Sequence, residues 1–189
     1  MKLDASKTAV LTLDLQKGIF SFASGTDAII PSAAKAVEFA RKKNYLLVHV
    51  GLGFAAGHPE IPPGESRFQR VKQNNLFVIG TPSAEFHPSV ANSGELIVYK
   101  QRVGGFSENH LHLLLRARGI QTLVLFGIST SGIVLSTIRR AFDLDYRCVV
   151  LKDACFDPDS EVHRVLTEKV FPGQGTVLNV DTFISEQGD

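Results

Sequence analysis

The chain has 189 residues, of which 44% are hydrophobic and 21% are charged, and its formal net charge is +1. These values are ordinary for one globular domain with a substantial core, and they give no electrostatic support to nucleic acid or an anionic membrane surface as a partner. The two cysteines cannot form a disulfide framework, and the apolar run at residues 8–13 is too short for a signal peptide or a membrane span. We therefore expect a soluble, cytoplasmic protein in which residues 1–189 form a single domain.

Two strands and a helix are predicted in the first quarter of the chain. Residues 8–15 (TAVLTLDL) are an apolar run that ends near Asp14, as expected for a strand buried on both faces. A carboxylate at the end of such a strand is unfavourable unless it is paired or functional, although a role in capping the next turn is equally open. Residues 31–43 have the period of an amphipathic helix, and residues 45–52 predict a second strand, in which His49 is expected to be a core histidine.

Residues 53–94 show no clear long element, because glycine, proline, asparagine and serine recur throughout them. An irregular segment of this length inside a compact domain is typical of a functional loop or lid. Arg67, Phe68 and Arg70 lie in its middle and are candidate ligand contacts, although solvated charge is the commoner role for such arginines. We expect this segment to supply the walls of a binding pocket.

Strands and helices alternate through the rest of the chain. The predicted elements are a strand at 95–100 that ends in Lys100, a helix from Ser107 to 117, a strand–helix–strand unit at 122–153, a helix at 160–168 and a strand at 175–180. This alternation, with mostly short connections, predicts an α/β fold in which helices cover both faces of a parallel sheet.

The turn at residues 127–132 (GISTSG) is the first candidate for a site. It follows the apolar strand 122–126 and precedes a helix that begins at Ile133, and its hydroxyl groups are of the type that caps a helix start. In open parallel sheets, ligands bind beside the carboxyl ends of the strands and the adjoining helix N-termini.

A serine hydrolase is one alternative for this turn. Ser129 and Ser131 lie on it, and Asp153 and His163 follow in the chain order of a nucleophile–acid–histidine triad. The nucleophile motif G-x-S-x-G requires glycine at position 131, however, so the pattern does not fit.

Other site classes have less support. His110 and His112 are two residues apart on a predicted helix and face different ways, which disfavours a metal site. No glycine-rich dinucleotide fingerprint follows a predicted strand, and no basic stripe indicates nucleic-acid binding. Asp14 and Lys100, each at the end of a predicted strand, remain as a charged pair that is either structural or catalytic.

Taken together, these strand ends resemble the isochorismatase-like hydrolase superfamily, which includes nicotinamidases, other cysteine amidases and isochorismatases. The similarity covers nearly the whole chain and depends on TAVLTLDLQKGI around Asp14, IVYKQRVGGF around Lys100, GISTSGIVLSTIRRAFDLDY, and LKDAC before DPDSEVH. It implies a three-layer α/β/α fold with a six-stranded, mostly parallel, Rossmann-like sheet. It also implies that Asp14 is the acid/base, that Lys100 is its charge partner, and that a cis peptide bond precedes Ser129.

The chain departs from that family at the nucleophile. The family's amidases carry cysteine in the pattern G-x-x-T-x-x-C-V-x-x-T, and here the cysteine position is Ile133. Because isoleucine has no nucleophilic atom, the thioester route to amide hydrolysis is closed. Isochorismatases also lack the cysteine, and the resemblance suggests that they use the aspartate to protonate a vinyl ether, which water then cleaves.

Two hypotheses follow. The first is a cysteine-independent hydrolase of a small metabolite, and the second is a binding or interaction protein that retains the fold without the chemistry. No cofactor or metal is expected, since His49-Val50-Gly51 stands where some nicotinamidases carry a metal-binding Asp-x-His. The resemblance implies a homo-oligomer, a dimer or tetramer. Expected substrate contacts are Phe20, Arg67, Phe106, Ser129, Thr130, Ser131 and Gly132.

Overall fold

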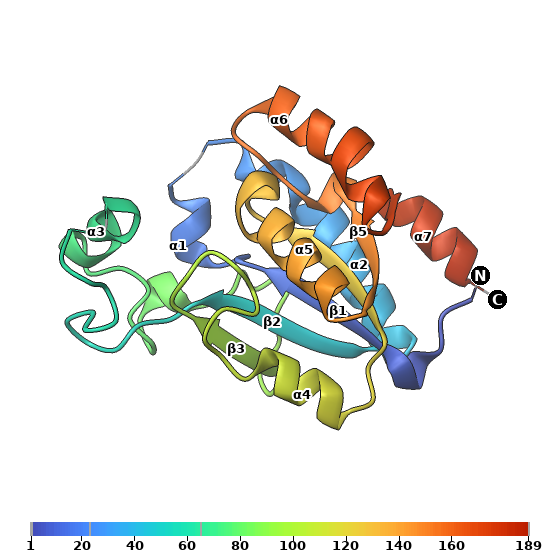
Figure 1. The fold of residues 1–189 in the computed structure, drawn as a ribbon, viewed down its shortest axis with the longest axis horizontal. Coiled ribbons are helices and arrows are strands. Elements are labelled where there is room, and N and C mark those ends of the chain that lie inside the picture. The colour runs from blue at the N-terminus through green and yellow to red at the C-terminus, as the bar shows by residue number, and fades with distance from the viewer. Residues whose placement is uncertain (1, 23, 65, 189) are drawn as a thin grey trace.

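A parallel sheet forms the centre of the molecule in the computed structural model, which describes residues 2–22, 24–64 and 66–188, without the side chains of residues 66 and 67. Within these ranges the sheet has six strands in the order β3-β2-β1-β4-β5-β6 (Figure 1). The strands are β1 (Thr8–Leu13), β2 (Leu46–Leu52), β3 (Leu96–Lys100), β4 (Thr122–Gly127), β5 (Arg147–Leu151) and β6 (Thr176–Leu178). The predicted α/β class and parallel sheet are confirmed.

The two central strands are buried along their whole length. β1 and β4 pair in parallel, from Thr8 opposite Thr122 to Leu13 opposite Gly127. Both strands are continuous apolar runs because layers of helices cover both faces of the sheet.

Helices lie on both faces of this sheet. Figure 1 shows α4 (Leu111–Ala117) and α5 (Leu135–Asp143) in front of the strands and α2 (Ile30–Lys42) behind them. α7 (Val180–Gln187) packs on α2, where the rings of Phe39 and Phe183 meet edge to face at 5.8 Å between centroids. The other helices are α1 (Lys17–Phe20), α3 (Ser66–Gln73) and α6 (Ser160–Val165). No helix in the described ranges combines the length and apolarity needed to cross a membrane.

Several boundaries differ from the sequence prediction. α7 was not expected, because its eight residues include three acidic or amide side chains beside few apolar ones. The helix expected from Ser107 begins at Leu111, since residues 104–110 form turns. The segment 53–94 contains α3, and four of its residues pack with Leu52 at the end of β2 in a small apolar cluster made of Leu52, Phe54, Ile61, Phe68 and Phe77.

The strand order determines where a site can form. The chain runs outward from β1 through β2 to β3, and then returns to β4 on the other side of β1. This reversal opens a crevice at the carboxyl ends of β1 and β4, the usual ligand position in such sheets. At this point Gly127 has φ +149°, and a Cβ atom there would lie 1.9 Å from the carbonyl oxygen of Leu13.

A buried polar network crosses β1 and β2 away from this crevice. The imidazole of His49 lies between the Thr12 hydroxyl, 2.7 Å from Nδ1, and the Glu95 carboxylate, 2.9 Å from Nε2. Glu95 also accepts hydrogen bonds from Arg41 Nε at 2.8 Å and from the Asn92 N–H at 2.7 Å. Burial alone raises the pKa of Glu95, but these hydrogen bonds outweigh it and hold the pKa at about 2. His49 is therefore a structural histidine.

We expect Glu95→Gln to remove part of the acid sensitivity of folding. Because the folded pKa of Glu95 lies below its unfolded value of 4.5, the carboxylate stabilises the fold above pH 4.5, by about 3 kcal/mol. This contribution is lost as the pH falls from 4.5 toward 2. Urea unfolding at pH 7 and at acidic pH measures the loss, and Glu85→Gln is the matched control, because Glu85 pairs with Lys17 on the surface. If the stability of both variants depends equally on pH, Glu95 is not the source of this acid sensitivity.

Candidate active site

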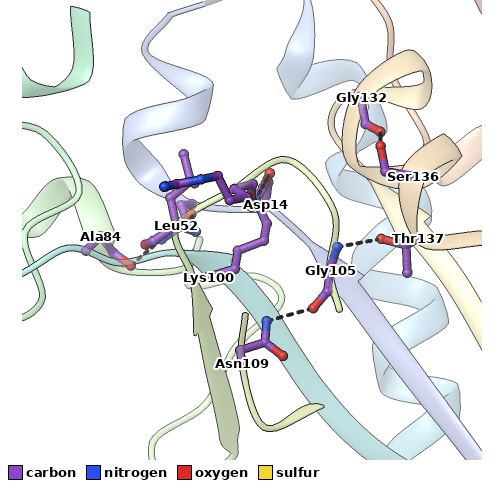
Figure 2. Close-up of polar contacts among 11 residues, drawn as sticks. Asp14, Leu52, Ala84, Lys100, Gly105, Asn109, Gly132, Ser136 and Thr137 are labelled. Atoms are coloured by element: carbon purple, nitrogen blue, oxygen red, sulfur yellow. Dashed lines mark hydrogen bonds and ion pairs between the residues drawn. The ribbon is translucent and has the colours of Figure 1, made fainter. Parts of the chain in front are cut away.

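Asp14 and Lys100 meet at the carboxyl ends of the strands. Asp14 follows β1 with φ +55°, and its N–H donates a 2.8 Å hydrogen bond to the carbonyl oxygen of Val50. Lys100 is the last residue of β3 and is 1% exposed. Its ammonium group donates to Asp14 Oδ2 at 3.0 Å and to the carbonyl oxygen of Arg102 at 3.1 Å. Figure 2 shows the Asp14 and Lys100 side chains close to each other. The pair expected from two distant strand ends is therefore in direct contact.

The Asp14 carboxyl group is buried and incompletely satisfied. Burial raises the pKa of this group, and the nearby Lys100 ammonium opposes that effect with a smaller lowering. The second oxygen, Oδ1, is buried and has no hydrogen-bond partner among the described residues. Since buried polar atoms are nearly always paired in native proteins, an unpaired carboxyl oxygen beside a cavity indicates a place for substrate or water.

The turn after β4 forms the third side of the site. The Ile128–Ser129 peptide bond is cis, as the resemblance implied, and residues Thr130–Val134 form a single π-helical turn before α5. Ile133 lies in this turn and is 2% exposed.

These groups surround a cavity of about 220 Å³, called the inner cavity below. Asp14, Lys100 and Ile133 all line it, together with Ser129 and Gly132. The rest of the wall is apolar and consists of Ile19, Leu52, Phe68, Val71, Val103 and Ile128. The inner cavity is thus a small apolar space in which a carboxyl group and its lysine partner are the charged side chains of the described wall.

Two of the expected substrate contacts in the turn face other partners. The Thr130 hydroxyl lies 2.8 Å from His163 Nδ1, and the Ser131 N–H donates to Asp157 at 2.7 Å. Neither residue is part of the described wall of the inner cavity, which takes Ser129 and Gly132 from this turn.

The remaining expected substrate contacts lie outside the described wall of the inner cavity. Phe20 stacks obliquely against His87, 5.2 Å between ring centroids, and its neighbour Ile19 lines the inner cavity instead. Phe106 lines a separate, adjoining cavity. The side chain of Arg67 lies outside the described part of the structure.

Residues of α3 and of the strand-end loops complete the wall. Phe68 and Val71, three residues apart on α3, project one apolar face into the inner cavity, and Val103 closes it from the loop after β3. The sequence signal for α3 was this apolar spacing within SRFQRVKQ, which is too short to stand out among glycines and prolines.

The adjoining cavity has a volume of about 910 Å³ and is called the outer cavity below. It shares Phe68 and Val103 with the inner cavity, so the two spaces meet at these side chains. Its other walls include Arg102, Phe106, Ser107, Glu108, Ser136 and Arg140.

Another cavity, of about 460 Å³, lies at the opposite end of the sheet and is lined by residues that include Thr122, Arg147 and Phe183. Thr122 and Arg147 begin β4 and β5, which places this cavity at the amino ends of the strands. Catalytic groups in parallel sheets gather at the carboxyl ends, so the inner cavity is the better candidate despite its smaller volume.

Neither cysteine belongs to the described wall of the inner cavity. Cys148 and Cys155 are buried free thiols, and burial raises the pKa of each to about 12. A thiol with such a pKa is almost entirely protonated at neutral pH, and the thiolate is the reactive form. Both therefore have the properties of structural cysteines.

The contacts of the other candidate groups support structural roles. Asp153 accepts hydrogen bonds from the Ser32 hydroxyl at 3.3 Å and the Val180 N–H at 2.8 Å, which attach α2 to the start of α7. His163 bonds to Thr130, so Asp153 and His163 do not form a triad with Ser129. Nδ1 of His112 lies 3.2 Å from the hydroxyl of Tyr146. Across the described ranges, no group of three or more His, Cys, Asp or Glu side chains is placed to hold a metal ion.

Comparison with known proteins agrees with this geometry. Residues 8–182 match the model of the isochorismatase domain family. The uncharacterized isochorismatase family protein YwoC of Bacillus subtilis (strain 168) is 32% identical over 187 residues, covering 98% of this chain and 97% of that protein. The ureidoacrylate amidohydrolase RutB of Variovorax paradoxus (strain S110) is 30% identical over 213 residues, covering 97% of this chain and 82% of that protein.

The solved structures show the same fold. A cysteine hydrolase from Pseudomonas syringae pv. phaseolicola 1448A superposes with a TM-score of 0.88 at 22% identity, covering 99% of this chain and 95% of that one. The strand order, the paired Asp14 and Lys100 beside the turn after β4, and a family match over nearly the whole sequence lead to one conclusion: the chain belongs to the isochorismatase family.

Proposed function

We propose that the protein is a hydrolase of a small metabolite that works by acid/base chemistry without a nucleophilic cysteine. In this proposal Asp14 is the acid/base, Lys100 is its charge partner, and Ile133 replaces the nucleophile with an apolar wall. The relative RutB is named for the hydrolysis of an amide, which supports hydrolysis as the class of reaction.

One observation carries the proposal. Asp14 presents a buried, unpaired Oδ1 beside a cavity, while Oδ2 is held by Lys100 at 3.0 Å. A buried ion pair is seldom better for stability than a well-packed apolar replacement, so this arrangement is poorly explained by folding alone. It is well suited to a group that must give and regain a proton.

The chemistry of a vinyl ether illustrates the role of each residue. Protonated Asp14 transfers its proton to the double-bond carbon that is not bonded to oxygen, and the other carbon becomes an oxocarbenium centre. Water adds to that centre, and the resulting hemiketal or hemiacetal collapses to a carbonyl compound and an alcohol, with one proton returning to Asp14. Lys100 stabilises the carboxylate between these two proton transfers. The raised pKa of Asp14 keeps more of it in the acid form.

The residues around Ile133 argue against a covalent route through a thiol. Its side chain has no lone pair, and the wall of the inner cavity in the described residues holds no thiol. Ser129 supplies a hydroxyl there, but no described base contacts it. Water is therefore the nucleophile in this proposal, and no acyl-enzyme forms.

An activity screen tests the proposal. Vinyl ethers, amides and lactones are incubated with the wild type and with Asp14→Asn in ¹⁸O water, and the products are analysed by mass spectrometry. We expect turnover of one class, with one ¹⁸O atom in the product and no covalent adduct on the protein. Turnover that persists in Asp14→Asn would refute the role of Asp14. No turnover of any class would favour the alternative, a small-molecule-binding or interaction protein that retains the fold.

We expect Ile133→Cys to create a reactive thiol in the inner cavity. The Lys100 ammonium and the start of α5 both favour a thiolate at this position, and Asp14 opposes it. Iodoacetamide should therefore label the new thiol several-fold faster in the folded protein than in urea. Cys148 and Cys155 are internal controls that should label more slowly when folded, because burial raises both pKa values to about 12. If position 133 labels no faster folded than unfolded, the cavity does not activate a nucleophile.

A further inference from the structure

We propose that the outer cavity binds an anionic group of the substrate through Arg102 and Arg140, so that the substrate is a small carboxylate or a similar anion. The proposal rests on the proposed function only in placing the cleaved bond in the inner cavity. The anionic group and the reacting bond then occupy two adjoining spaces of one site.

The inner and outer cavities adjoin each other and share part of their walls. Phe68 and Val103 line both spaces. The carbonyl oxygen of Arg102 accepts a 3.1 Å hydrogen bond from the Lys100 ammonium, while the same residue lines the outer cavity. Arg102 thus holds Lys100 through its backbone carbonyl group and contributes positive charge to the outer cavity.

The charge on the described wall of the outer cavity is net positive, because it contains Arg102 and Arg140 against the single carboxylate of Glu108. Arg102 donates to the carbonyl oxygens of Gln101 at 2.7 Å and Glu60 at 3.2 Å, which orients its guanidinium group. Two of five N–H groups are used in this way, and the others have no hydrogen-bond partner among the described residues. Arg140 has no side-chain hydrogen bond or ion pair within the described ranges.

The chain segments that carry the two arginines are attached to each other through the loop after β3. The Gly105 N–H donates to the Thr137 hydroxyl of α5 at 3.0 Å, and the Asn109 side chain donates to the carbonyl oxygen of Gly105 at 2.9 Å (Figure 2). A Cβ atom at Gly105 would lie 2.8 Å from Thr137 Oγ1, so the loop approaches the helix closely. This contact attaches the segment that carries Arg102 to the helix that carries Arg140, which favours recognition of an anion by both.

The inner cavity is a poor place for the anionic group. Its lysine already contacts Asp14 and the Arg102 carbonyl oxygen, and most of its other described lining is apolar. A second anion there would also be repelled by an ionised Asp14. An anion therefore binds more favourably in the outer cavity.

Binding of paired neutral and anionic probes tests the inference without relying on catalysis. Benzoate, 3-phenylpropionate and maleate are compared with their neutral amides by calorimetric titration at low salt. We expect at least one carboxylate to bind about tenfold more tightly than its amide. Arg140→Gln and Arg102→Gln should each lower the affinity for that carboxylate by about fivefold to tenfold. Neither substitution should alter binding of the amides.

Arg139→Gln is the matched control, because Arg139 is the neighbouring exposed arginine of α5 and does not line the outer cavity. It makes the same change in net charge, so it should leave carboxylate binding unchanged. The inference is wrong if Arg139→Gln and Arg140→Gln weaken binding equally, if amides bind as well as acids, or if no carboxylate binds at about 20 mM. Carboxylate binding without hydrolysis would refute only the proposed function, and hydrolysis without preference for anions would refute only this inference.

Discussion

Replacing Asp14 with asparagine should lower the proposed hydrolysis rate by roughly 10²- to 10⁴-fold, the range for loss of a general acid/base. Asparagine has nearly the same shape and can still accept a hydrogen bond from Lys100, so the cavity should keep its form. Thermal unfolding of the variant, measured beside its activity, separates lost chemistry from lost structure. A folded Asp14→Asn protein with near-normal activity would show that another group moves the proton.

The pH dependence of the rate provides a second test of the same residue. A general acid acts in its protonated form, and burial raises the pKa of Asp14 above the ordinary value of 3.8. The rate of wild type should therefore fall as the pH rises through this raised pKa. In Asp14→Asn the residual rate should not follow that titration. A wild-type rate that instead rises with pH in this range would assign Asp14 the role of a base.

The second large effect is expected on stability. Gly127→Ala should prevent folding or destabilise the protein by more than about 3 kcal/mol, because neither the steric contact nor the backbone conformation can relax easily. The added Cβ would lie 1.9 Å from the carbonyl oxygen of Leu13, which accepts a 3.0 Å hydrogen bond from the N–H of Ile128. The clash thus falls between the two central strands. Urea unfolding, or the yield of folded protein, measures the effect.

Gly119→Ala is the control for this substitution. Gly119 also has a positive φ, +66°, but a Cβ there would meet no heavy atom within 4 Å. Gly119→Ala should therefore lower the free energy of unfolding by only about 1 kcal/mol, the usual cost of alanine in the left-handed backbone conformation. If both variants lose the same stability, the close approach of Gly127 to β1 is not a constraint on the fold.

The sheet was predictable because its strands are continuous apolar runs separated by helices with a clear period. The same runs identified Asp14 and Lys100, since a charged residue at the end of a buried strand is conspicuous. Ile133 was located through the similarity to a family motif rather than through any physical property of isoleucine.

The walls of the site were harder to predict, because cavities depend on packing between segments that are distant in sequence. Phe68 was noted as a candidate contact, but Val71 and Val103 are ordinary apolar residues until α3 and the loop after β3 are placed beside the inner cavity. Arg140 has the sequence pattern of a solvated helix residue, and only the loop attached to Thr137 brings the segment of Arg102 near it. Phe20 and Ile19 are adjacent on the short helix α1 and therefore point in different directions. Ile19 lines the inner cavity, whereas Phe20 packs against His87.

The strand order also has a consequence for synthesis on the ribosome. β1 is complete after residue 13, yet its partner on one side, β4, begins only at residue 122. During the translation of more than half of the chain, one edge of this fully buried strand has no native partner, while β2 can already join its other edge and β3 can join β2. An unpaired apolar edge is a template for association with other chains. Nascent chains that end before β4 should therefore be the species that most needs chaperones, and pausing of translation within residues 101–121 should prolong that exposure.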